Sequence, residues 1–273
     1  MTTSTPTAPL HDWREAGDAW GHAAHDWATL YEHYSIDILL AMFSKIGIDE
    51  GSDVIDIACG SGLGVRLACA MGATVSAIDA AEPLIEIARD RSPNADIRVG
   101  SMFDLPWPDG SFDAAMSVNG IWGGCEEALA EAHRVLRPGA PIGISFWGRG
   151  RGRPLHLRDA IRVFAANSPD VAVRGMVKTN DIAKEGVAEA MLEAAGFDVV
   201  EHGTRESTIE WPDADTAWRA LRSTGPAVPA LRNTDHDSLK AEVLEAIDHC
   251  RDVRGIYRFR NEHHFVIAHK RVT

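Results

Sequence analysis

The sequence predicts an α/β fold in which a mostly parallel sheet carries helices on both faces. Between Asp53 and Trp147, short apolar runs of strand length alternate with amphipathic segments of helical length, a pattern typical of strand–helix–strand units. Proline and glycine mark the changeovers, as in the run LRPG at 136–139, where a helix would stop and the chain would turn. The chain has 273 residues, of which 45% are hydrophobic, so it can bury one full core.

The apolar pattern places each expected element. Strands are expected at 53–58, 74–79, 97–100, 112–118 and 140–146, with helices between them at 63–71, 82–92 and 125–136. After Trp147 the alternation is lost, and the pattern predicts a helix at 185–195, strands at 197–209 and 257–269, and helices at 213–222 and 236–250. The expected sheet therefore has seven strands, and the helices that do not alternate with strands are candidates for a cap over it.

An aromatic repeat precedes the alternating region. Trp13, Trp20 and Trp27 recur every seven residues, so one continuous helix would place them on one stripe. Gly17 and Gly21 make two short helices an equal alternative. We expect one domain over 1–273, made of a helical leader or lid at 1–45, a ligand-binding core at 53–147, and cap helices with the remaining strands at 148–273.

Charge and cysteine usage exclude several classes of partner. The 27 basic and 40 acidic side chains give a net charge of −13, which would repel a nucleic-acid backbone. No apolar stretch reaches the roughly 20 residues that span a bilayer, and the first residues have no signal-peptide core. The four cysteines are widely spaced without a CxxC pair, which favours a reducing compartment and no zinc site. A cytoplasmic protein without nucleic-acid or membrane partners is expected, and a homodimer is left open.

The run VIDIACGSGLG at 54–64 predicts a ligand loop. A strand that ends in a glycine-rich turn and opens a helix is where open parallel sheets bind ligands. The loop lacks the lysine of a nucleoside-triphosphate loop, and Val65 stands where a dinucleotide fingerprint has its third glycine. Asp56 lies in the strand just upstream, and a buried carboxylate is tolerated when it is paired. These features favour a ligand with a cationic group.

A second acid extends this interpretation. Asp79 ends the second expected strand. Its separation along the chain from the glycine loop is close to the roughly 20 residues expected for a carboxylate that binds a ribose diol. The run GSMFDLPW at 100–107 follows the third strand and offers a hydroxyl and apolar side chains to a purine. The expected ligand is therefore an adenosine joined to an amino acid.

Residues 53–147 resemble the Rossmann-like, class I S-adenosylmethionine-dependent methyltransferases, in particular a small-molecule branch similar to quinone-biosynthesis enzymes. The resemblance rests on four ordered motifs: VIDIACGSG, AIDAAEPLIEIAR, DLPWPDGSFDAAMSVN and EAHRVLRPGAPIGIS. The leader run DAWGHAAHDWATLYEHY is also similar to the segment that closes over the cofactor in that branch. The resemblance implies a small-molecule methyl acceptor, S-adenosyl-L-methionine as cofactor and S-adenosyl-L-homocysteine as product.

The resemblance also implies roles for individual residues. Asp56, Ala58, Gly60 and Gly62 would hold the methionine end, Asp79 the ribose hydroxyls and Ala80 the adenine, with Ser101 and Met102 beside the base and Asn119 near the methionyl part. Ala58 replaces the usual first glycine of the loop, which is tolerable if its φ is negative. Ser101 replaces a common aspartate and can still bond the purine amino group. Trp20, Trp27 and Trp122 would provide aromatic walls, Trp20 beside the cofactor and the other two beside the acceptor.

Catalytic residues are harder to assign than binding residues. Methyl transfer needs orientation and a dry site more than a dedicated base. By residue type alone, His22 and His25 are the candidates to accept a proton from an acceptor hydroxyl. Neither this histidine pair nor His263 and His264 has a third metal ligand at convincing spacing, so no metal is expected. Two other functions fit the same fold: an NAD-dependent oxidoreductase and a non-catalytic S-adenosylmethionine-binding protein.

Overall fold

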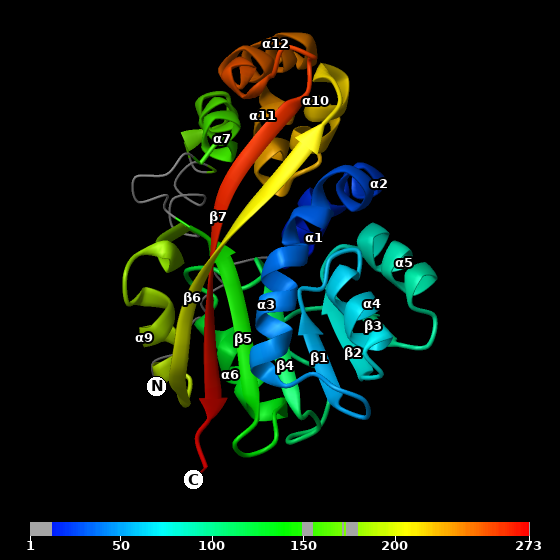
Figure 1. Ribbon diagram of the computed structural model, residues 1–273, viewed down its shortest axis with the longest axis vertical. Helices are drawn as coiled ribbons and strands as arrows, with labels where there is room; N and C mark the ends of the chain where they lie inside the picture. Colours follow the sequence, from blue (N-terminus) through cyan, green and yellow to red (C-terminus); the bar gives the residue numbers. More distant parts are fainter. Residues whose placement is uncertain (1–12, 149–154, 171, 173–179, 273) are drawn as a thin grey trace, which may run out of the picture.

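The computed structural model of the chain describes residues 13–148, 155–170, 172 and 180–272. Through these residues runs a seven-stranded sheet of order β3-β2-β1-β4-β5-β7-β6 (Figure 1). Its strands are β1 (Asp53–Ile57), β2 (Thr74–Asp79), β3 (Asp96–Val99), β4 (Ala114–Val118), β5 (Pro141–Trp147), β6 (Phe197–Trp211) and β7 (Tyr257–Lys270). The predicted seven-stranded, mostly parallel α/β fold is confirmed.

The first five strands are parallel, and β7 runs antiparallel to both β5 and β6. The central strand β1 is apolar on both faces, and Val54, Ile55 and Ile57 are fully buried. Such strands form a sheet only when both faces are covered, because each face must leave water. Because β1, β2 and β4 are parallel, their carboxyl ends meet at one edge of the sheet. Parallel sheets bind ligands at this edge.

Helices cover both faces of the sheet, as the sequence predicts. One face packs against α3 (Ile36–Ile46), α4 (Leu63–Ala70) and α5 (Glu82–Arg91). The other face packs against α6 (Glu126–Val135) and α9 (Val187–Ala194). The predicted helices of the alternating region are confirmed to within two residues at each end.

The leader is built from short helices. It consists of α1 (Trp13–Gly21), α2 (Ala24–Asp26), a π-helical turn (Trp27–Tyr31) and a 3-10 turn (Glu32–Ser35) that leads into α3. The structure thus settles the alternative left open by the tryptophan repeat. Gly17 has a packing role rather than a helix-breaking one, because a Cβ there would lie 2.2 Å from the carbonyl oxygen of Ala80.

A helical cap lies beyond one end of the sheet, at the top of Figure 1. It comprises α7 (Leu157–Ala166), α10 (Ala214–Arg222), the 3-10 turn η4 (Gly225–Ala227), α11 (Val228–Asn233), α12 (His236–Ala246) and the 3-10 turn η5 (Asp248–Cys250). The helix predicted at 236–250 therefore ends at Ala246. The cap shares an apolar cluster with Tyr31 and Tyr34 of the leader, so leader and cap are packed together. None of the described helices is long and apolar enough to cross a bilayer.

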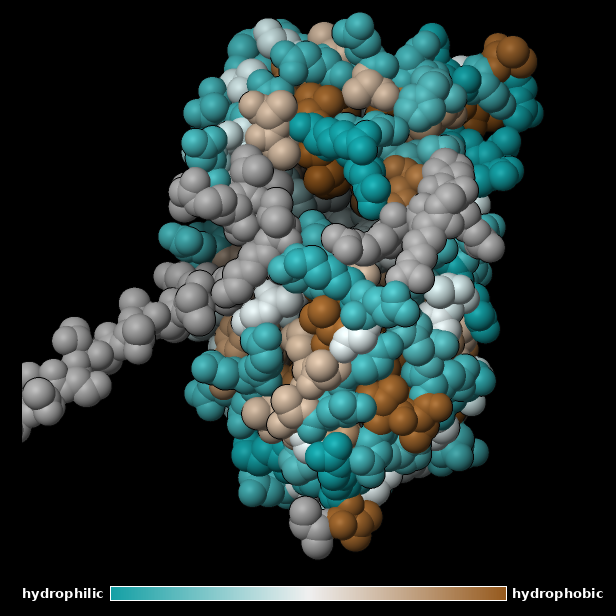
Figure 2. Space-filling view, turned by 90° about the vertical axis from the view of Figure 1, so that its left-hand side faces the viewer, coloured by the Kyte–Doolittle hydropathy of each residue, from teal (hydrophilic) through white to brown (hydrophobic). Residues whose placement is uncertain are grey.

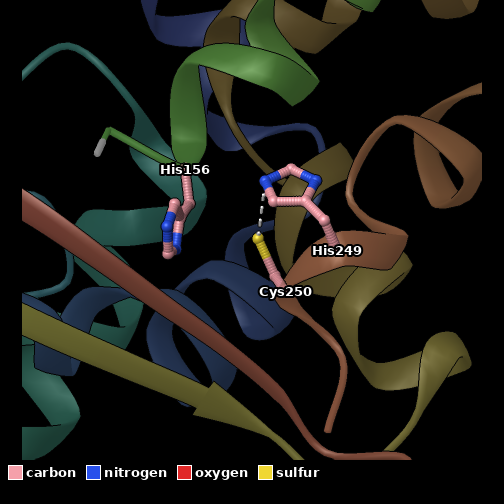
Figure 3. Close-up of side chains that lie close together, drawn as sticks. All are labelled: His156, His249 and Cys250. Atoms are coloured by element: carbon pink, nitrogen blue, oxygen red, sulfur yellow. Dashed lines mark hydrogen bonds between the residues drawn. The ribbon is translucent and has the colours of Figure 1, made fainter.

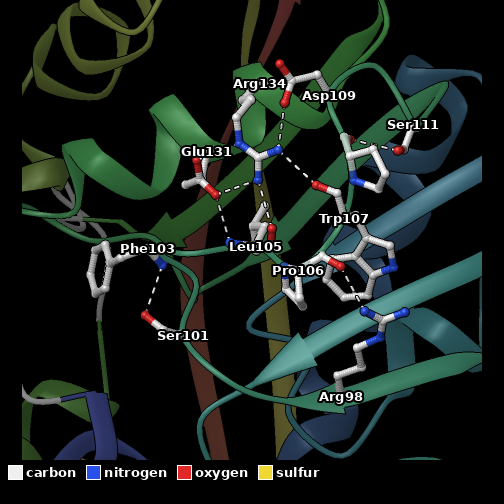
Figure 4. A network of polar contacts seen from close by, with 11 residues as sticks. Arg98, Ser101, Phe103, Leu105, Pro106, Trp107, Asp109, Ser111, Glu131 and Arg134 are labelled. Carbon is white, nitrogen blue, oxygen red and sulfur yellow. Dashed lines mark hydrogen bonds and ion pairs between the residues drawn. The ribbon is translucent and has the colours of Figure 1, made fainter.

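One arginine fixes the long loop between β3 and β4 (Figure 4). The guanidinium of Arg134, on α6, donates hydrogen bonds to the carbonyl oxygens of Leu105 and Trp107, each at 2.8 Å. It also pairs with Glu131 at 2.7 Å, and Glu131 accepts a bond from the Leu105 amide. The fork of Arg134 thus holds a loop whose first residues, at 102 and 103, line the cavity described below.

We predict that Arg134→Ala lowers the free energy of unfolding by about 1–3 kcal/mol, because two loop carbonyls and Glu131 lose a charged donor. Arg134→Lys should recover part of the loss, since an ammonium cannot reproduce the planar fork. Urea denaturation measures the effect. Arg66→Ala, an exposed change on α4, is the matched control. Equal stability of the Arg134→Ala and Arg66→Ala proteins would contradict this role.

Candidate active site

A cavity of about 800 Å³ lies at the carboxyl edge of the sheet. Residues at the ends of β1, β2 and β4 line it on one side, and residues of the leader and the cap line the other. Figure 2 shows the surface hollowed in the upper half of the molecule, with apolar side chains at the opening. The volume is in the range of small-molecule sites, which are about 300–1,000 Å³.

The structure brings most of the predicted ligand residues to this cavity. Those that line it are Trp20, Asp56, Ala58, Gly60, Asp79, Ala80, Met102 and Asn119, together with Trp27 and Trp122. Gly62 and Ser101 are outside the lining. A Cβ on Gly62 would lie 2.8 Å from that of Ala88, so this glycine allows α4 to pack on α5. Ser101 Oγ instead accepts a hydrogen bond from the Phe103 amide at 3.1 Å.

Asp79 is tied to the glycine loop. Its Oδ2 accepts a hydrogen bond from the Gly60 amide at 2.9 Å, and its Oδ1 accepts one from the Ala81 amide at 2.8 Å. Burial raises the pKa of Asp79, and these amide bonds oppose the rise. The carboxylate thus organises the loop and still faces the cavity.

Asp56 is the most deeply buried acid of the site. It is 4% exposed and lines the cavity. Gly64 makes space for it, because a Cβ at that position would lie 2.7 Å from Asp56 Oδ2. Burial, followed by the neighbouring charges of Asp79 and Glu32, raises the pKa of Asp56 to about 8. A cation placed beside this group would favour its ionised form.

Glu32 is a third acid of the cavity, and no sequence pattern points to it. Its Oε2 accepts bonds from Ser61 Oγ at 2.5 Å and from Arg91 at 2.8 Å. Arg91 also donates to the carbonyl oxygens of Ser61 and Ala28. Leader, glycine loop and α5 therefore meet at one guanidinium. Glu32 Oε1 is buried and has no hydrogen-bond partner within the described residues.

The backbone of Ala58 corrects one expectation. Its φ is +60°, in the left-handed region, so the expected negative φ is wrong. The strain is on the order of 1 kcal/mol for a residue other than glycine. Gly120 provides the space, because a Cβ there would lie 2.4 Å from the Cβ of Ala58. The loop thus keeps the geometry of a glycine turn with alanine in it.

Asn119 links the sheet edge to the leader. It has a φ of +55° just after β4, and its Nδ2 donates a hydrogen bond to the Tyr34 hydroxyl at 3.0 Å. Trp122 Nε1 donates to the Asn119 carbonyl at 2.6 Å. Asn119 Oδ1 is buried without a hydrogen-bond partner among the residues described. It is an acceptor available to a ligand.

Aromatic rings from distant segments wall the cap side of the cavity. Trp20 contacts Trp27 edge to face, with ring centroids 5.0 Å apart, and Trp122 at 6.1 Å. Tyr34 stacks on Trp147 at 4.8 Å. The other apolar lining residues on this side are Tyr31, Phe103, Phe146, Leu155, Leu157, Ile161 and Ile182. These aromatic and aliphatic walls suit an apolar ligand, and the lining of the cavity also includes the charged side chains of Arg158 and Asp181.

The two histidines proposed as proton acceptors lie elsewhere. The ring nitrogens of His22 contact the carbonyl oxygens of Ala19 and Arg222, each at 2.8 Å. His25 is exposed. Neither residue belongs to the cavity lining, and no histidine does so within the part of the chain that the structure describes.

Comparison with known proteins identifies this arrangement. Residues 55–143 match the family described as "Methyltransferase domain". A 2-phytyl-1,4-naphtoquinone methyltransferase of Nostoc sp. is 34% identical over 131 residues, which are 44% of this chain and 56% of the Nostoc protein. A malonyl-[acyl-carrier protein] O-methyltransferase of Pseudescherichia vulneris is 28% identical and covers 78% of this chain and 79% of its own. The chain spans about half the length of the first curated relatives it matches.

The fold has counterparts among solved structures. Phosphoethanolamine N-methyltransferase 2 of Haemonchus contortus, solved with phosphomonomethylethanolamine and S-adenosylhomocysteine, superposes with a TM-score of 0.59 at 15% identity. The superposition covers 98% of this chain and 62% of that one. The sheet order, the ordered motifs and these similarities together show that residues 55–143 form a methyltransferase domain of the Rossmann-like, S-adenosylmethionine-dependent class.

Proposed function

We propose that this protein transfers a methyl group from S-adenosylmethionine to a small-molecule acceptor by in-line displacement. The proposal rests on one continuous cavity. It joins the buried acids beside the glycine loop of the methyltransferase domain to a chamber walled by aromatic rings. One end offers groups for a cationic, ribose-bearing cofactor, and the other offers an apolar site. The proposal treats 1–273 as one functional domain, because the leader, the core and the cap all contribute lining residues.

The residues at the acidic end fit the cofactor. Asp79 would take the ribose hydroxyls and Asp56 the ammonium group, while Ala80 and Met102 would border the adenine. The partnerless Oδ1 of Asn119 and Oε1 of Glu32 are acceptors that an ammonium group or its water shell would satisfy. A floor of buried carboxylates without a bound cation is electrostatically costly, which further supports a cationic ligand.

When bound, the cofactor supplies a sulfonium-activated methyl group, and the protein supplies position and dryness. Leader and cap cover the cavity and would exclude water from the acceptor, although Arg158 and Asp181 also reach the lining. Trp27 and Trp122 wall this chamber. Burial raises the pKa of Tyr34, so its hydroxyl stays protonated and acts as a hydrogen-bonding group rather than a base.

The chamber indicates the class of acceptor. Its described lining contains no histidine, and Asp181 is the carboxylate that lines it besides Glu32, Asp56 and Asp79, so we propose an acceptor that loses its proton without an imidazole base, such as an acidic phenol or enol. The aromatic walls suit a flat, neutral molecule. We therefore propose an apolar ring-containing acceptor, which is chemically closer to the naphthoquinone named in the Nostoc relative than to the phosphomonoester bound in the Haemonchus enzyme.

The experiment that tests the function combines binding and transfer. Calorimetry should show binding of S-adenosylmethionine and S-adenosylhomocysteine but not of NAD. Methyl-labelled cofactor incubated with an extract of small molecules should then label a component of the apolar fraction. NAD binding without a response to S-adenosylhomocysteine would support the oxidoreductase alternative, whereas cofactor binding with no labelled product in any fraction would support a non-catalytic binding protein.

We predict that Asp79→Asn weakens S-adenosylhomocysteine binding by about 10- to 100-fold. The change removes the charge that accepts two ribose hydroxyls, and a hydrogen bond to a charged group contributes about 1.5–3 kcal/mol. Asparagine keeps one acceptor for the Gly60 or Ala81 amide, so the loop should persist. Calorimetry of the variant beside Asp90→Asn, an exposed change on α5, measures the effect. An unchanged dissociation constant would place the ribose elsewhere.

A second prediction concerns the pH dependence of cofactor affinity. Since the pKa of Asp56 is raised to about 8, the group is mostly protonated at pH 7, and a bound ammonium would drive off its proton. Cofactor affinity should therefore rise between pH 6 and pH 8, by up to about tenfold per pH unit. In the free protein the sign is opposite, because a raised carboxyl pKa stabilises the fold at low pH and this contribution is lost as pH rises towards 8.

Calorimetry in two buffers of different ionisation enthalpy counts the released protons. The native protein should release close to one proton at pH 7, and Asp56→Asn should release clearly less. The Asp90→Asn protein provides the matched comparison. If the native binding enthalpy is the same in both buffers, Asp56 does not respond to the ligand and its proposed role is wrong.

The leader yields a further prediction. In an exposed helix, Gly17→Ala would stabilise by about 1 kcal/mol, but here the new methyl group would meet the Ala80 carbonyl. Overpacking of this kind costs about 1–3 kcal/mol, so the leader should lift and S-adenosylhomocysteine binding should weaken about tenfold or more. Asp18→Ala, on the exposed face of the same helix, is the control. Tighter binding by Gly17→Ala would show that α1 does not close over the cofactor.

A further inference from the structure

Three potential metal ligands from two distant segments meet in the cap (Figure 3). His156 lies just before α7, whereas His249 and Cys250 belong to η5. One donor atom of each side chain lies within 4.8 Å of the other two. Among the described residues, this is the one group of three histidine, cysteine or acidic side chains that meets this spacing.

Two distances, both to His249 Nε2, match those of a tetrahedral zinc site. Cys250 Sγ lies 3.4 Å from His249 Nε2. Asp159 Oδ2, one turn into α7, lies 3.4 Å from the same nitrogen. With zinc–sulfur bonds of about 2.3 Å and zinc–nitrogen or zinc–oxygen bonds of about 2.0–2.1 Å, neighbouring ligand atoms of a tetrahedral site are roughly 3.3–3.6 Å apart. Asp159 is not part of the group whose donor atoms all lie within 4.8 Å of one another, so both His156 and Asp159 would move inward to complete the set.

We propose that His156, His249, Cys250 and Asp159 bind a zinc ion. Two imidazoles, one thiolate and one carboxylate are a ligand set that zinc accepts. Cys250 is 7% exposed and Asp159 is partly buried, so the ion would lie beneath the surface with His249 on the solvent side.

Zinc binding needs a neutral His156 ring and a deprotonated Cys250, and the raised pKa of Cys250 opposes the second requirement. Burial lowers the pKa of His156, which keeps its imidazole neutral as a ligand must be. Burial and then Asp159 raise the pKa of Cys250 to about 12, so the thiol holds its proton until a metal ion displaces it. Binding breaks the S–H bond, forms a zinc–sulfur bond and releases one proton to solvent. The His156 ring must also give up a 3.2 Å hydrogen bond that its Nδ1 accepts from the Arg260 amide.

The ion would have a structural role. It would join the start of α7 to the end of the cap, and α7 provides Leu157 and Ile161 to the cavity lining. Four protein ligands leave no open position for a substrate or a reactive water. The site therefore adds to the proposed methyl transfer without depending on it. The sequence predicted no metal, because no ligand-spacing motif connects position 156 with positions 249 and 250.

Cobalt and zinc titrations of the full-length, chelator-treated protein test the proposal. Co²⁺ should bind with one equivalent and give a thiolate-to-cobalt charge-transfer band, which Zn²⁺ then abolishes. Zinc at about a hundredfold excess over its dissociation constant should raise Tm by about 5 °C. Cys250→Ala should lose the band, and His249→Ala should bind Co²⁺ at least about tenfold more weakly. Cys69→Ser and His236→Ala are the matched controls, each of which should behave like the native protein.

Two results would overturn the proposal. One is a folded native protein that gives no charge-transfer band with Co²⁺, and the other is a band that persists in Cys250→Ala. If Cys250→Ala does not fold, His249→Ala decides, because its side chain is 53% exposed and can be removed with little effect on packing. Native affinity for Co²⁺ in His249→Ala would then reject the site.

Discussion

Burial of the Asp56 carboxylate at the carboxyl edge of the sheet is the constraint on which the rest of the site depends. A charge in this position is tolerated only if the surroundings compensate for lost hydration. In the free protein this cost is met by protonation, because burial and the charges of Asp79 and Glu32 raise the pKa of Asp56 to about 8, while Gly64 leaves space for the group. Glu32 adds more negative charge and is balanced by Arg91. The remaining imbalance favours a positively charged ligand, so the demand for a cation follows from the fold itself.

The Glu32–Arg91 pair connects this electrostatic constraint to the architecture. Arg91 is on α5, Glu32 is in the leader, and Ser61 is in the glycine loop, so one guanidinium spans three segments that meet only in the folded chain. The leader and the glycine loop cannot separate without breaking the contacts that Arg91 makes with Glu32 and Ser61. The same side chains thus stabilise the fold and define the proposed cofactor site.

The sequence predicts the cofactor half of the site because its information is local. Asp56 and Asp79 each end a strand, and parallel strands bring their ends to one edge, so periodicity alone places both acids together. Glu32 and Tyr34 could not be found in this way, because the leader carries no strand signal and reaches the cavity through packing.

Ala58 shows a different limit of sequence reasoning. Alanine at a glycine position is a clue to ordinary backbone geometry, yet the residue keeps a left-handed φ because Gly120, on another strand end, leaves space for its methyl group. The left-handed φ of Ala58 depends on Gly120, which is far from it in the chain, so no local pattern indicates it. The short helices of the leader are similar, since Gly17 is required by the Ala80 carbonyl and not by helix propensity.

The position of the cap in the chain has an evolutionary consequence. Apart from α7, the cap helices are inserted between β6 and β7. These two strands pair with each other, and β7 also pairs with β5, so the sheet is fixed on both sides of the insertion. Residues 212–256 can therefore change in length and sequence without altering any strand register. The glycine loop and the proposed acceptor chamber can then diverge at different rates, so that a lineage could acquire a new acceptor while the residues proposed to bind the cofactor stay nearly constant.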